Sequence, residues 1–307
     1  MEPPAATSKL RIFLFLALNF FSGVGCVSVN KIIFQVFHFR YGTLLTVLHF
    51  IFTAIGLRLC LQMGVFEYKK IELRAVLPMC VCFSLYITLT NLSLLYNSVN
   101  FSQLVKILTT PLMVFVQRTY YGQSFPIQIQ CSLVLICLGV ALSSVKDAEA
   151  NVVGTLVAFS ALGATVRYQI DVGEKQTELQ CSAFQLLYYQ APLSALLMLP
   201  LVPIFDDITS LTKVPDASTL LVILVSCVLG FLVNLSIFLV IGSTSAITYN
   251  VLGHFKLISI LIAGFTLFGV VPTWFSVSGS ALAIAGVAWY TNLKSKGNEP
   301  SSSPPYP

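Results

Sequence analysis

The amino-acid sequence predicts an all-α integral membrane protein with ten transmembrane helices, arranged as two inverted five-helix repeats. Of its 307 residues, 56% are hydrophobic and only 9% are charged, which is too little polar surface for a water-soluble fold of this size. Apolar stretches of about 20 residues, the length that crosses roughly 30 Å of hydrocarbon, recur along almost the whole chain. A weak internal duplication relates the first five stretches to the last five.

The ten expected spans follow one another with only short connections. They lie at 12–36, 43–63, 75–96, 99–120, 126–145, 152–172, 182–204, 218–240, 245–268 and 274–293. The first span resembles a signal peptide, but it is long, lacks a clean cleavage site and is followed by nine more, so we expect it to remain uncleaved. The Pro/Ser-rich residues 297–307 are expected to form a disordered cytosolic tail.

Basic residues are distributed unevenly between the two sides of the predicted bundle. With the N-terminus placed in the cytosol, eleven fall at cytosolic ends or loops: Lys9, Arg11, Arg58, Lys69, Lys70, Arg74, Arg118, Arg167, Lys175, Lys294 and Lys296. Three fall on the other side: Arg40, Lys146 and Lys213. This bias satisfies the positive-inside rule and predicts that both termini are cytosolic.

The internal duplication rests on two matching segments. The third span of the first half ends in Asn91–Ser93 and leads to a helix that carries Lys106, while Asn234–Ser236 in the second half leads similarly to Lys256. Because each half has five spans, an odd number, the two copies must be inserted in opposite senses. The predicted halves are residues 1–150 and 151–296. Such symmetry places the substrate site at the interface of the halves.

Stripes of small residues at helical spacing permit close helix packing. They are Gly154, Ala158 and Ala161, and then Gly279, Ala283 and Gly286. We expect them to pack helices within the chain, although the same stripes would accommodate a second copy and leave a homodimer open. The eight cysteines lie in or beside apolar segments without metal-ligand spacing, so we expect them to pack as small hydrophobic residues.

Three lysines inside predicted spans have no acidic residue to pair with. All twelve acidic residues fall in or near a loop, a terminus or a helix end, whereas Lys31, Lys106 and Lys256 lie within spans. A lysine at the centre of a membrane helix costs about 2.5–3.5 kcal/mol. We therefore expect the missing partner to be an anionic small-molecule substrate, unless each lysine extends to a membrane interface instead.

A phosphate or diphosphate would suit the expected pair of Lys106 and Lys256. The repeat would bring these lysines face to face near the midplane, where each binds phosphate as a point charge. Tyr249 lies seven residues before Lys256, about two helical turns, so its hydroxyl could join Lys256 on the phosphate. Lys31, near the end of its helix, is a further phosphate-binding candidate.

The other end of the ligand is expected at aromatic and amide side chains. Tyr188, Tyr189 and Gln190 form a run in the seventh span in which rings could stack on a base and the amide could pair with its edge. Tyrosines near a membrane interface are also common without any ligand. Thr248 and His254 are further candidates near the base or sugar, whereas His49 is expected to be a hydrogen-bonded core residue.

The sequence carries no catalytic signature. It contains no Gly-x-Ser-x-Gly, no His-Glu-x-x-His, no phosphate-binding Gly-rich loop and no intramembrane aspartate pair, so we expect neither an enzyme nor a cofactor. The expected surroundings are the lipid bilayer and a small anionic substrate, with no nucleic acid.

Several motifs together resemble the nucleotide-sugar and triose-phosphate translocator family of the drug/metabolite transporter superfamily. The similarity covers nearly the whole chain and is closest to subfamily E of solute carrier family 35 and to plant carriers of UDP-sugars. The matching segments are Asn30–Lys31, Ser102–Lys106 with Thr109–Pro111, Leu187–Pro192 and Thr248–Lys256.

The resemblance implies ten helices in two inverted halves, a Golgi or endoplasmic-reticulum membrane, and antiport of a nucleotide sugar against its nucleoside monophosphate. It also implies Lys256 at the phosphates and Tyr188–Tyr189 at the base. Triose-phosphate carriers typically have Arg directly after the lysine, where this chain has Leu257, and guanine-sugar carriers have Tyr-Asn-Asn where this chain has Gln190 and Ala191. These departures favour a UDP-sugar.

The predicted mechanism is alternating access, in which Lys106 and Lys256 neutralise the diphosphate while the halves rock around it. Because unpaired lysines disfavour movement of an empty site, the carrier should be an obligate exchanger. Three alternatives stay open: a phosphoenolpyruvate or triose-phosphate exchanger, an exporter of neutral or cationic solutes, and a membrane scaffold that transports nothing.

Overall fold

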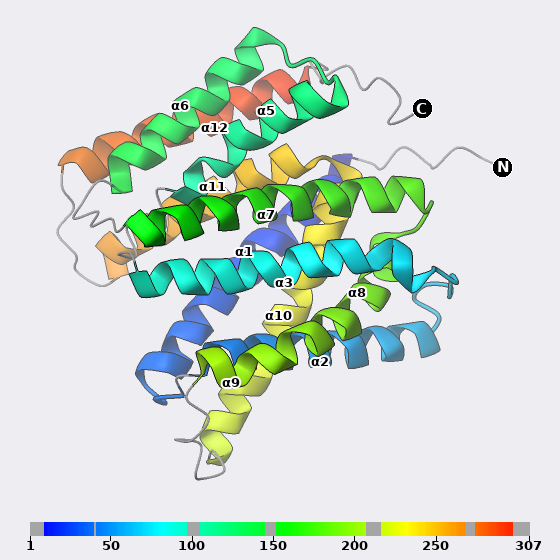
Figure 1. The fold of residues 1–307 in the computed structure, drawn as a ribbon. Coiled ribbons are helices and arrows are strands. Elements are labelled where there is room, and N and C mark those ends of the chain that lie inside the picture. The colour runs from blue at the N-terminus through cyan, green and yellow to red at the C-terminus, as the bar shows by residue number, and fades with distance from the viewer. Residues whose placement is uncertain are drawn as a thin grey trace. The chain divides into compact units, whose positions relative to one another are not determined.

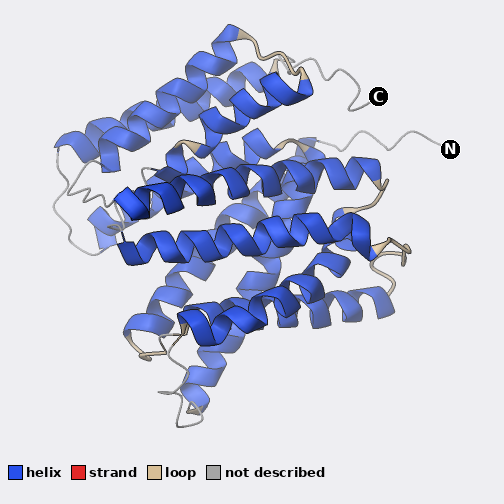
Figure 2. Ribbon diagram, in the orientation of Figure 1, coloured by secondary structure: helices blue, strands red, loops and turns tan. Residues whose placement is uncertain are grey.

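The computed structural model describes residues 9–39, 41–96, 105–144, 152–206, 216–267 and 274–296. Within these ranges the chain is helical, and Figure 2 shows helices joined by loops without a β-strand. The expected tail, 297–307, lies outside the described residues, as do Arg40, Lys146 and Lys213, which were assigned to the non-cytosolic side.

Each of the ten predicted spans overlaps with a helix of the structure. The elements in Figure 1 are α1 (Lys9–Gln35), α2 (Gly42–Gln62), α3 (Leu73–Tyr96), α5 (Thr109–Tyr121), α6 (Ile127–Ser144), α7 (Val152–Glu178), α8 (Ala183–Met198), η1 (Leu199–Leu201), α9 (Val202–Phe205), α10 (Ala217–Ser243), α11 (Ala246–Leu267) and α12 (Trp274–Ser295). The seventh span is divided into α8, η1 and α9, where Pro200 and Pro203 each remove a backbone N–H from the helical hydrogen-bond pattern.

Several of these helices are long and apolar enough to cross a membrane. Among the described residues, five meet this requirement: Lys9–Gln35, Gly42–Gln62, Leu73–Thr90, Ala183–Phe205 and Ala217–Ser243. Large apolar side chains such as Phe13, Phe21 and Leu221 are exposed on them. Hydrocarbon solvates such surfaces and water does not, so the prediction of an all-helical, multi-pass membrane protein is confirmed.

The chain forms two compact units, which are described separately below. The first contains the chain up to Ser84 together with Tyr168–Ala246, and the second contains Leu85–Arg167 and the chain from Ile247 onward. Each unit therefore combines segments from both halves of the sequence.

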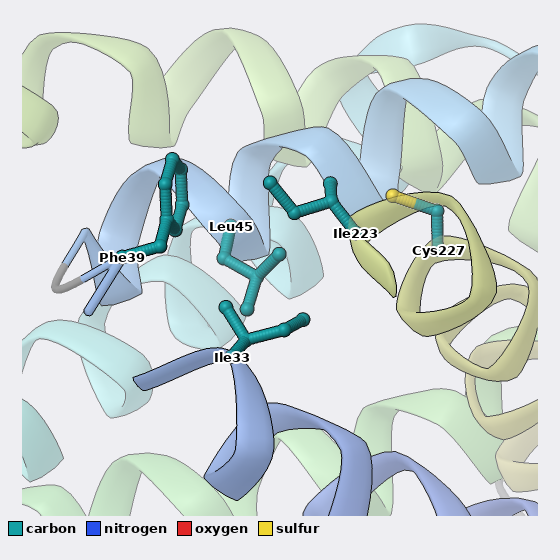
Figure 3. Packing of buried hydrophobic residues seen from close by; sticks show 5 residues of the cluster. All are labelled: Ile33, Phe39, Leu45, Ile223 and Cys227. Carbon is teal, nitrogen blue, oxygen red and sulfur yellow. The ribbon is translucent and has the colours of Figure 1, made fainter. Parts of the chain in front are cut away.

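The core of the first unit is built from α1, α2 and α10. Figure 3 shows Ile33 of α1 and Leu45 of α2 next to each other, with Ile223 and Cys227 of α10 in the same cluster and Phe39 from the α1–α2 connection. Cys227 thus packs as a small hydrophobic residue, as expected. Burial raises the pKa of the Cys181 thiol, which keeps this cysteine of the α7–α8 turn protonated near neutral pH.

Buried polar residues join α1, α2 and α10 through specific hydrogen bonds. Asn19 donates to the Ser236 hydroxyl at 2.9 Å, and Ser226 donates to Asn30 Oδ1 at 2.5 Å. Because the single hydroxyl proton of Ser226 is used in that bond, His49 Nε2, 2.8 Å from Ser226 Oγ, must be the donor between them. The expectation that His49 is a hydrogen-bonded core residue is confirmed.

The first turn of α2 is capped by a residue from a distant part of the sequence. Tyr41, which precedes α2, gives no side-chain cap, but the buried carboxylate of Asp206 accepts hydrogen bonds from the backbone N–H groups of Thr43 (3.1 Å) and Leu44 (2.7 Å). These N–H groups have no partner within their own helix, and the helix dipole also favours an anion there. Asp206 therefore fixes the end of α9 against the start of α2.

The contacts between connections agree with the predicted sidedness. Lys69 donates to the Gln180 carbonyl and Gln185 donates to the Glu67 carbonyl, so the α2–α3 and α7–α8 connections meet, as the prediction of a shared cytosolic side requires. Asp206 and Thr43 meet at the other ends of their helices, which the prediction also places on one side. These contacts show which connections lie on the same side of the helices. Which of the two sides faces the cytosol stays a prediction.

One prediction about acidic residues was wrong. The sixth span was expected to end at residue 172, which would leave Asp171 at a helix end, but α7 continues to Glu178 and Asp171 is buried. The drop in hydropathy after Arg167 marks a change in surroundings and not the end of the helix, since polar residues continue a helix as long as the backbone is unobstructed.

In the second unit, α6 and α12 pack with their backbones in contact. A Cβ atom placed on Gly139 would lie 2.4 Å from the backbone nitrogen of Ala283 and 2.7 Å from the carbonyl oxygen of Gly279, and one on Gly286 would lie 2.8 Å from Ile136. The predicted role of this stripe in helix packing is confirmed. Since α6 fills the stripe, a homodimer would need a different surface.

Substitution of Gly139 by alanine should destabilise the protein by about 1–3 kcal/mol, because the added methyl group meets backbone atoms that cannot move aside independently. Gly163 is a matched control, since a Cβ there meets nothing within 4 Å and Gly163→Ala should be neutral or stabilising by up to about 1 kcal/mol. Thermal unfolding of the purified variants in detergent tests both. Equal melting temperatures for the two variants would contradict the close contact.

Removal of the Asp206 cap should also lower stability. Asp206→Ala leaves the two N–H groups of α2 without partners and should cost about 1 kcal/mol. Asp206→Asn keeps one side-chain oxygen and should lose less. If thermal unfolding gives the same melting temperature for the alanine variant and the unmodified protein, the cap does not stabilise α2.

Candidate substrate site

The predicted phosphate-binding residues of α11 share one face of that helix. The Nζ atom of Lys256 lies 5.4 Å from the centre of the Tyr249 ring, and both side chains are half-buried. Seven residues correspond to about two helical turns, so the spacing in the sequence correctly predicted this shared face. A cation over an aromatic ring is attracted by the electron density of the ring face, which helps to hold the ammonium group inside the bundle.

Lys106 lies in the helical segment 105–107, directly before α5. Its side chain is exposed, while its neighbours Val105 and Ile107 are buried. In the part of the chain that the structure describes, no carboxylate forms an ion pair with Lys106. Lys106 therefore keeps, among the described residues, the property that made it a candidate, which is a cationic group between buried apolar neighbours without an acidic partner.

The remaining polar residues of the α11 motif contact neighbouring helices. The Nε2 atom of His254 lies 2.8 Å from the Thr110 hydroxyl of α5, and Asn250 donates to the Met113 sulfur at 3.4 Å. Thr248 is hydrogen-bonded to the Tyr290 hydroxyl of α12 at 3.2 Å. His254 and Asn250 are buried, and Thr248 is partly buried.

The fourth phosphate-binding candidate, Lys31, belongs to the first unit. It lies one turn before the end of α1, and its side chain is exposed. From this position a lysine can reach a membrane interface or a ligand, so both predicted roles remain open. The neighbouring Asn30 accepts the hydrogen bond from Ser226, which ties this end of α1 to α10.

Tyr188 and Tyr189 of α8 anchor the connection between α2 and α3. The Tyr189 hydroxyl donates to the Lys69 carbonyl (2.9 Å) or the Tyr68 hydroxyl (3.0 Å) and accepts from the Ile71 N–H (3.1 Å). Arg58 donates to the Tyr188 hydroxyl at 3.2 Å. The rings of Phe66 and Phe184 complete an aromatic cluster around these tyrosines.

Gln190 is the deepest of the three base-binding candidates. Its side chain is completely buried, and its amide donates to the Tyr168 hydroxyl of α7 at 3.0 Å. The start of α8 is fixed by a capping box, in which Ser182 and Gln185 each bond to the backbone of the other. In this conformation the polar groups of Tyr189 and Gln190 hold α8 against its neighbours.

Two residues near these candidates carried no signal in the sequence. Tyr86 of α3 belongs to the same unit as Tyr249 and is partly buried. Arg58 reaches Tyr188 from α2. Both stand in apolar segments at positions that look like ordinary interface residues, and only the packing of the helices identifies their neighbours.

The described residues contain no group of three or more His, Cys, Asp or Glu side chains that could hold a metal ion. The polar side chains of α11 offer ammonium, phenol, amide, imidazole and hydroxyl groups, on Lys256, Tyr249, Asn250, His254 and Thr248. Such groups bind anions through charge and hydrogen bonds.

Known proteins match almost the whole chain. The Triose-phosphate Transporter family matches residues 10–291. UDP-xylose transporter 2 of Arabidopsis thaliana is 34% identical over 280 residues, which cover 90% of this chain and 79% of that protein. UDP-rhamnose/UDP-galactose transporter 1 of the same plant is 30% identical over 295 residues, or 93% of this chain and 85% of the relative.

A solved crystal structure shares the fold with a TM-score of 0.72, at 14% sequence identity and with coverage of 91% of this chain and 98% of that one. The family match spans the lysine-bearing segments in both halves of the sequence and the helices that hold them. The protein therefore belongs to the Triose-phosphate Transporter family.

Proposed function

We propose that the protein is a nucleotide-sugar antiporter, which exchanges a UDP-sugar for a nucleoside monophosphate by alternating access. The observation that carries this proposal is the shared face of Lys256 and Tyr249 on α11. This face offers a cation and a phenol to an anionic ligand. The names of the plant relatives, which are transporters of UDP-xylose and of UDP-rhamnose and UDP-galactose, supply the substrate class.

The charge of the site favours a diphosphate ligand. Lys106 has no carboxylate partner among the described residues, and Lys256 is followed by Leu257 in place of a second cation. Two separate ammonium groups can each neutralise one phosphate of a nucleoside diphosphate ester. A compact sugar phosphate would be held better by two adjacent cations.

The same charges explain why exchange should be obligatory. An ammonium group that crosses the membrane midplane without an anion costs several kcal/mol, and the anionic substrate removes most of that cost. The empty carrier should then change its orientation slowly and the loaded carrier quickly. UDP-sugar uptake would depend on a nucleotide that leaves in the opposite direction.

The membrane arrangement belongs to the same proposal. Ten spans in two inverted five-helix halves, with both termini in the cytosol, would place Lys106 and Lys256 on equivalent helices of the two halves. The unequal distribution of basic residues supports this orientation. We assign the carrier to the Golgi or endoplasmic-reticulum membrane, where nucleotide sugars made in the cytosol are consumed.

The base and sugar end of the ligand is assigned to Tyr188, Tyr189, Gln190 and Thr248. Their hydroxyl and amide groups contact other parts of the protein in this structure, and the rings of Tyr188 and Tyr189 already pack against Phe66, Tyr68 and each other. A base that stacks on either tyrosine would take the place of one of these ring contacts. Lys31 is assigned to the phosphates. A base that needs the Gln190 amide would have to displace Tyr168.

A phosphate-ester exchanger is the second candidate, because the name of the matching family refers to triose phosphate. It would use the same lysines and would be distinguished by stronger binding of phosphoenolpyruvate or inorganic phosphate than of UMP. A scaffold without transport activity would bind none of these ligands.

Purified protein should be stabilised against heat by UMP and UDP, by about 2.7 kcal/mol when the ligand is present at about 100 times its dissociation constant. Lys256→Ala should abolish this stabilisation. Lys175→Ala is the matched control, since Lys175 forms an ion pair with Glu178 at the end of α7 and its loss should leave ligand binding unchanged. Stabilisation that survives in Lys256→Ala would contradict the proposed phosphate site.

Exchange is tested in liposomes that contain the purified protein. Uptake of radiolabelled UDP-xylose should be several-fold faster into vesicles loaded with UMP than into vesicles without a nucleotide, because only the loaded carrier returns quickly. The control vesicles contain the Lys256→Ala variant, and we expect no uptake of UDP-xylose into them, with or without UMP inside. Equal uptake into loaded and empty vesicles would rule out obligatory antiport.

A further inference from the structure

A pair of polar contacts joins α5 to α11 next to both proposed phosphate-binding lysines. His254 lies two residues before Lys256, and its partner Thr110 lies four residues after Lys106. About one turn further along, Asn250 contacts Met113. We call the His254–Thr110 and Asn250–Met113 contacts the clamp. Both belong to the second unit, and His254, Thr110 and Met113 are buried.

The clamp fixes the register of the two helices. Residue numbers rise along α5 while those of their partners fall along α11, so the helices run antiparallel. At 1.5 Å per residue, Lys106 lies about 6 Å beyond Thr110 along the axis, and Lys256 lies about 3 Å beyond His254 in the same direction. The two lysines are therefore at neighbouring levels, and a slip of α11 by one turn would move them about 5 Å relative to each other.

The α11 motif presents different residues on different sides. His254 and Asn250, four residues apart, face α5, whereas Tyr249 and Lys256, seven residues apart, share another face. One side of α11 thus contacts α5, while another side carries the Lys256 ammonium group.

We propose that His254 and Thr110 are positioning residues, which hold α5 and α11 at the spacing that lets Lys106 and Lys256 bind the two phosphates of one nucleoside diphosphate. This inference rests on the proposed function. His254 acts through the lysines, and its Nε2 atom is used by Thr110. The clamp sets the preference for a diphosphate over a monophosphate, because a monophosphate needs only one of the two lysines.

The apolar surroundings explain why the clamp is polar. Between helices in a membrane, the hydrophobic effect provides no force that selects one register over another, since lipid is as apolar as leucine. A directional hydrogen bond between two buried groups does select a register, because a slip would leave both groups unsatisfied.

The test measures the dissociation constants of UDP and UMP for the purified full-length chain, together with its melting temperature without ligand. Thr110→Val and His254→Asn remove the His254–Thr110 contact of the clamp, since valine lacks the hydroxyl and the asparagine amide is too short to reach Thr110. Thr110→Ser and His254→Gln keep a group that can form the bond and serve as matched controls. Two independent positions guard against a variant that fails to fold.

Either breaking variant should weaken UDP binding by about tenfold and UMP binding by less than about threefold, so that the ratio of the two affinities falls. The two controls should restore the ratio. In the double variant Thr110→Val/His254→Asn, the loss should be close to that of one single variant, because the pair acts as a unit.

Other results would overturn the inference. If the breaking variants lower the melting temperature but leave the UDP-to-UMP ratio unchanged, the clamp is only structural and the proposed function stands. If the unmodified protein binds neither nucleotide, the proposed function fails and the inference fails with it. These two failures are distinguishable, because the first requires intact nucleotide binding that depends on Lys256.

Discussion

Hydrocarbon offers no hydrogen bonds, so a polar group within a membrane-spanning helix is costly unless it finds a partner in the protein or in a ligand. The first unit shows how this protein meets the constraint. Asn19 and Ser236 bond to each other, Ser226 and His49 bond in a chain that ends at Asn30, and Asp206 supplies oxygens to the first turn of α2. Each of these bonds joins helices that are distant in sequence, so satisfying polar groups and fixing the arrangement of the helices are one process.

Two cationic groups of the second unit meet the same constraint differently. Lys256 is attracted to the Tyr249 ring, and Lys106 has no acidic partner in the described part of the chain. A carboxylate beside either lysine would neutralise its charge permanently and compete with an anionic substrate. An aromatic ring stabilises the cation less strongly and can release it. A carrier that must bind and release its cargo is better served by a weak partner.

Sequence reasoning succeeded where structure follows from local periodicity. The seven-residue spacing of Tyr249 and Lys256 gave their shared face, and the stripe of Gly279, Ala283 and Gly286 gave the close packing of α12, because both depend only on the geometry of one helix. The predicted end of α7 was wrong, because hydropathy reports the surroundings of a helix and not its length.

Partners on different helices were not predictable in the same way. His254 and Thr110 are 144 residues apart, and nothing in either segment states which helix is its neighbour or in which register. The cap that Asp206 provides for α2 was equally unpredictable, since an acidic residue beside a loop usually faces water. The phosphate-binding and base-binding roles of the candidate residues stay predictions, because ligand contacts follow from the position of both units and of the ligand.

The α11 motif shows why so many of its residues are polar although few of them need to touch a ligand. Thr248 bonds to α12, Asn250 and His254 contact α5, and this leaves Tyr249 and Lys256 on a face of their own. A helix that presents a charge to a small ligand must be held to within about half an ångström, since looser placement weakens the electrostatic gain. Hydrogen bonds between buried groups add a directional preference to the packing of the side chains, because a slip would leave both groups without a partner. Three polar side chains of the motif are therefore used in contacts with α5 and α12, apart from the face that carries Lys256.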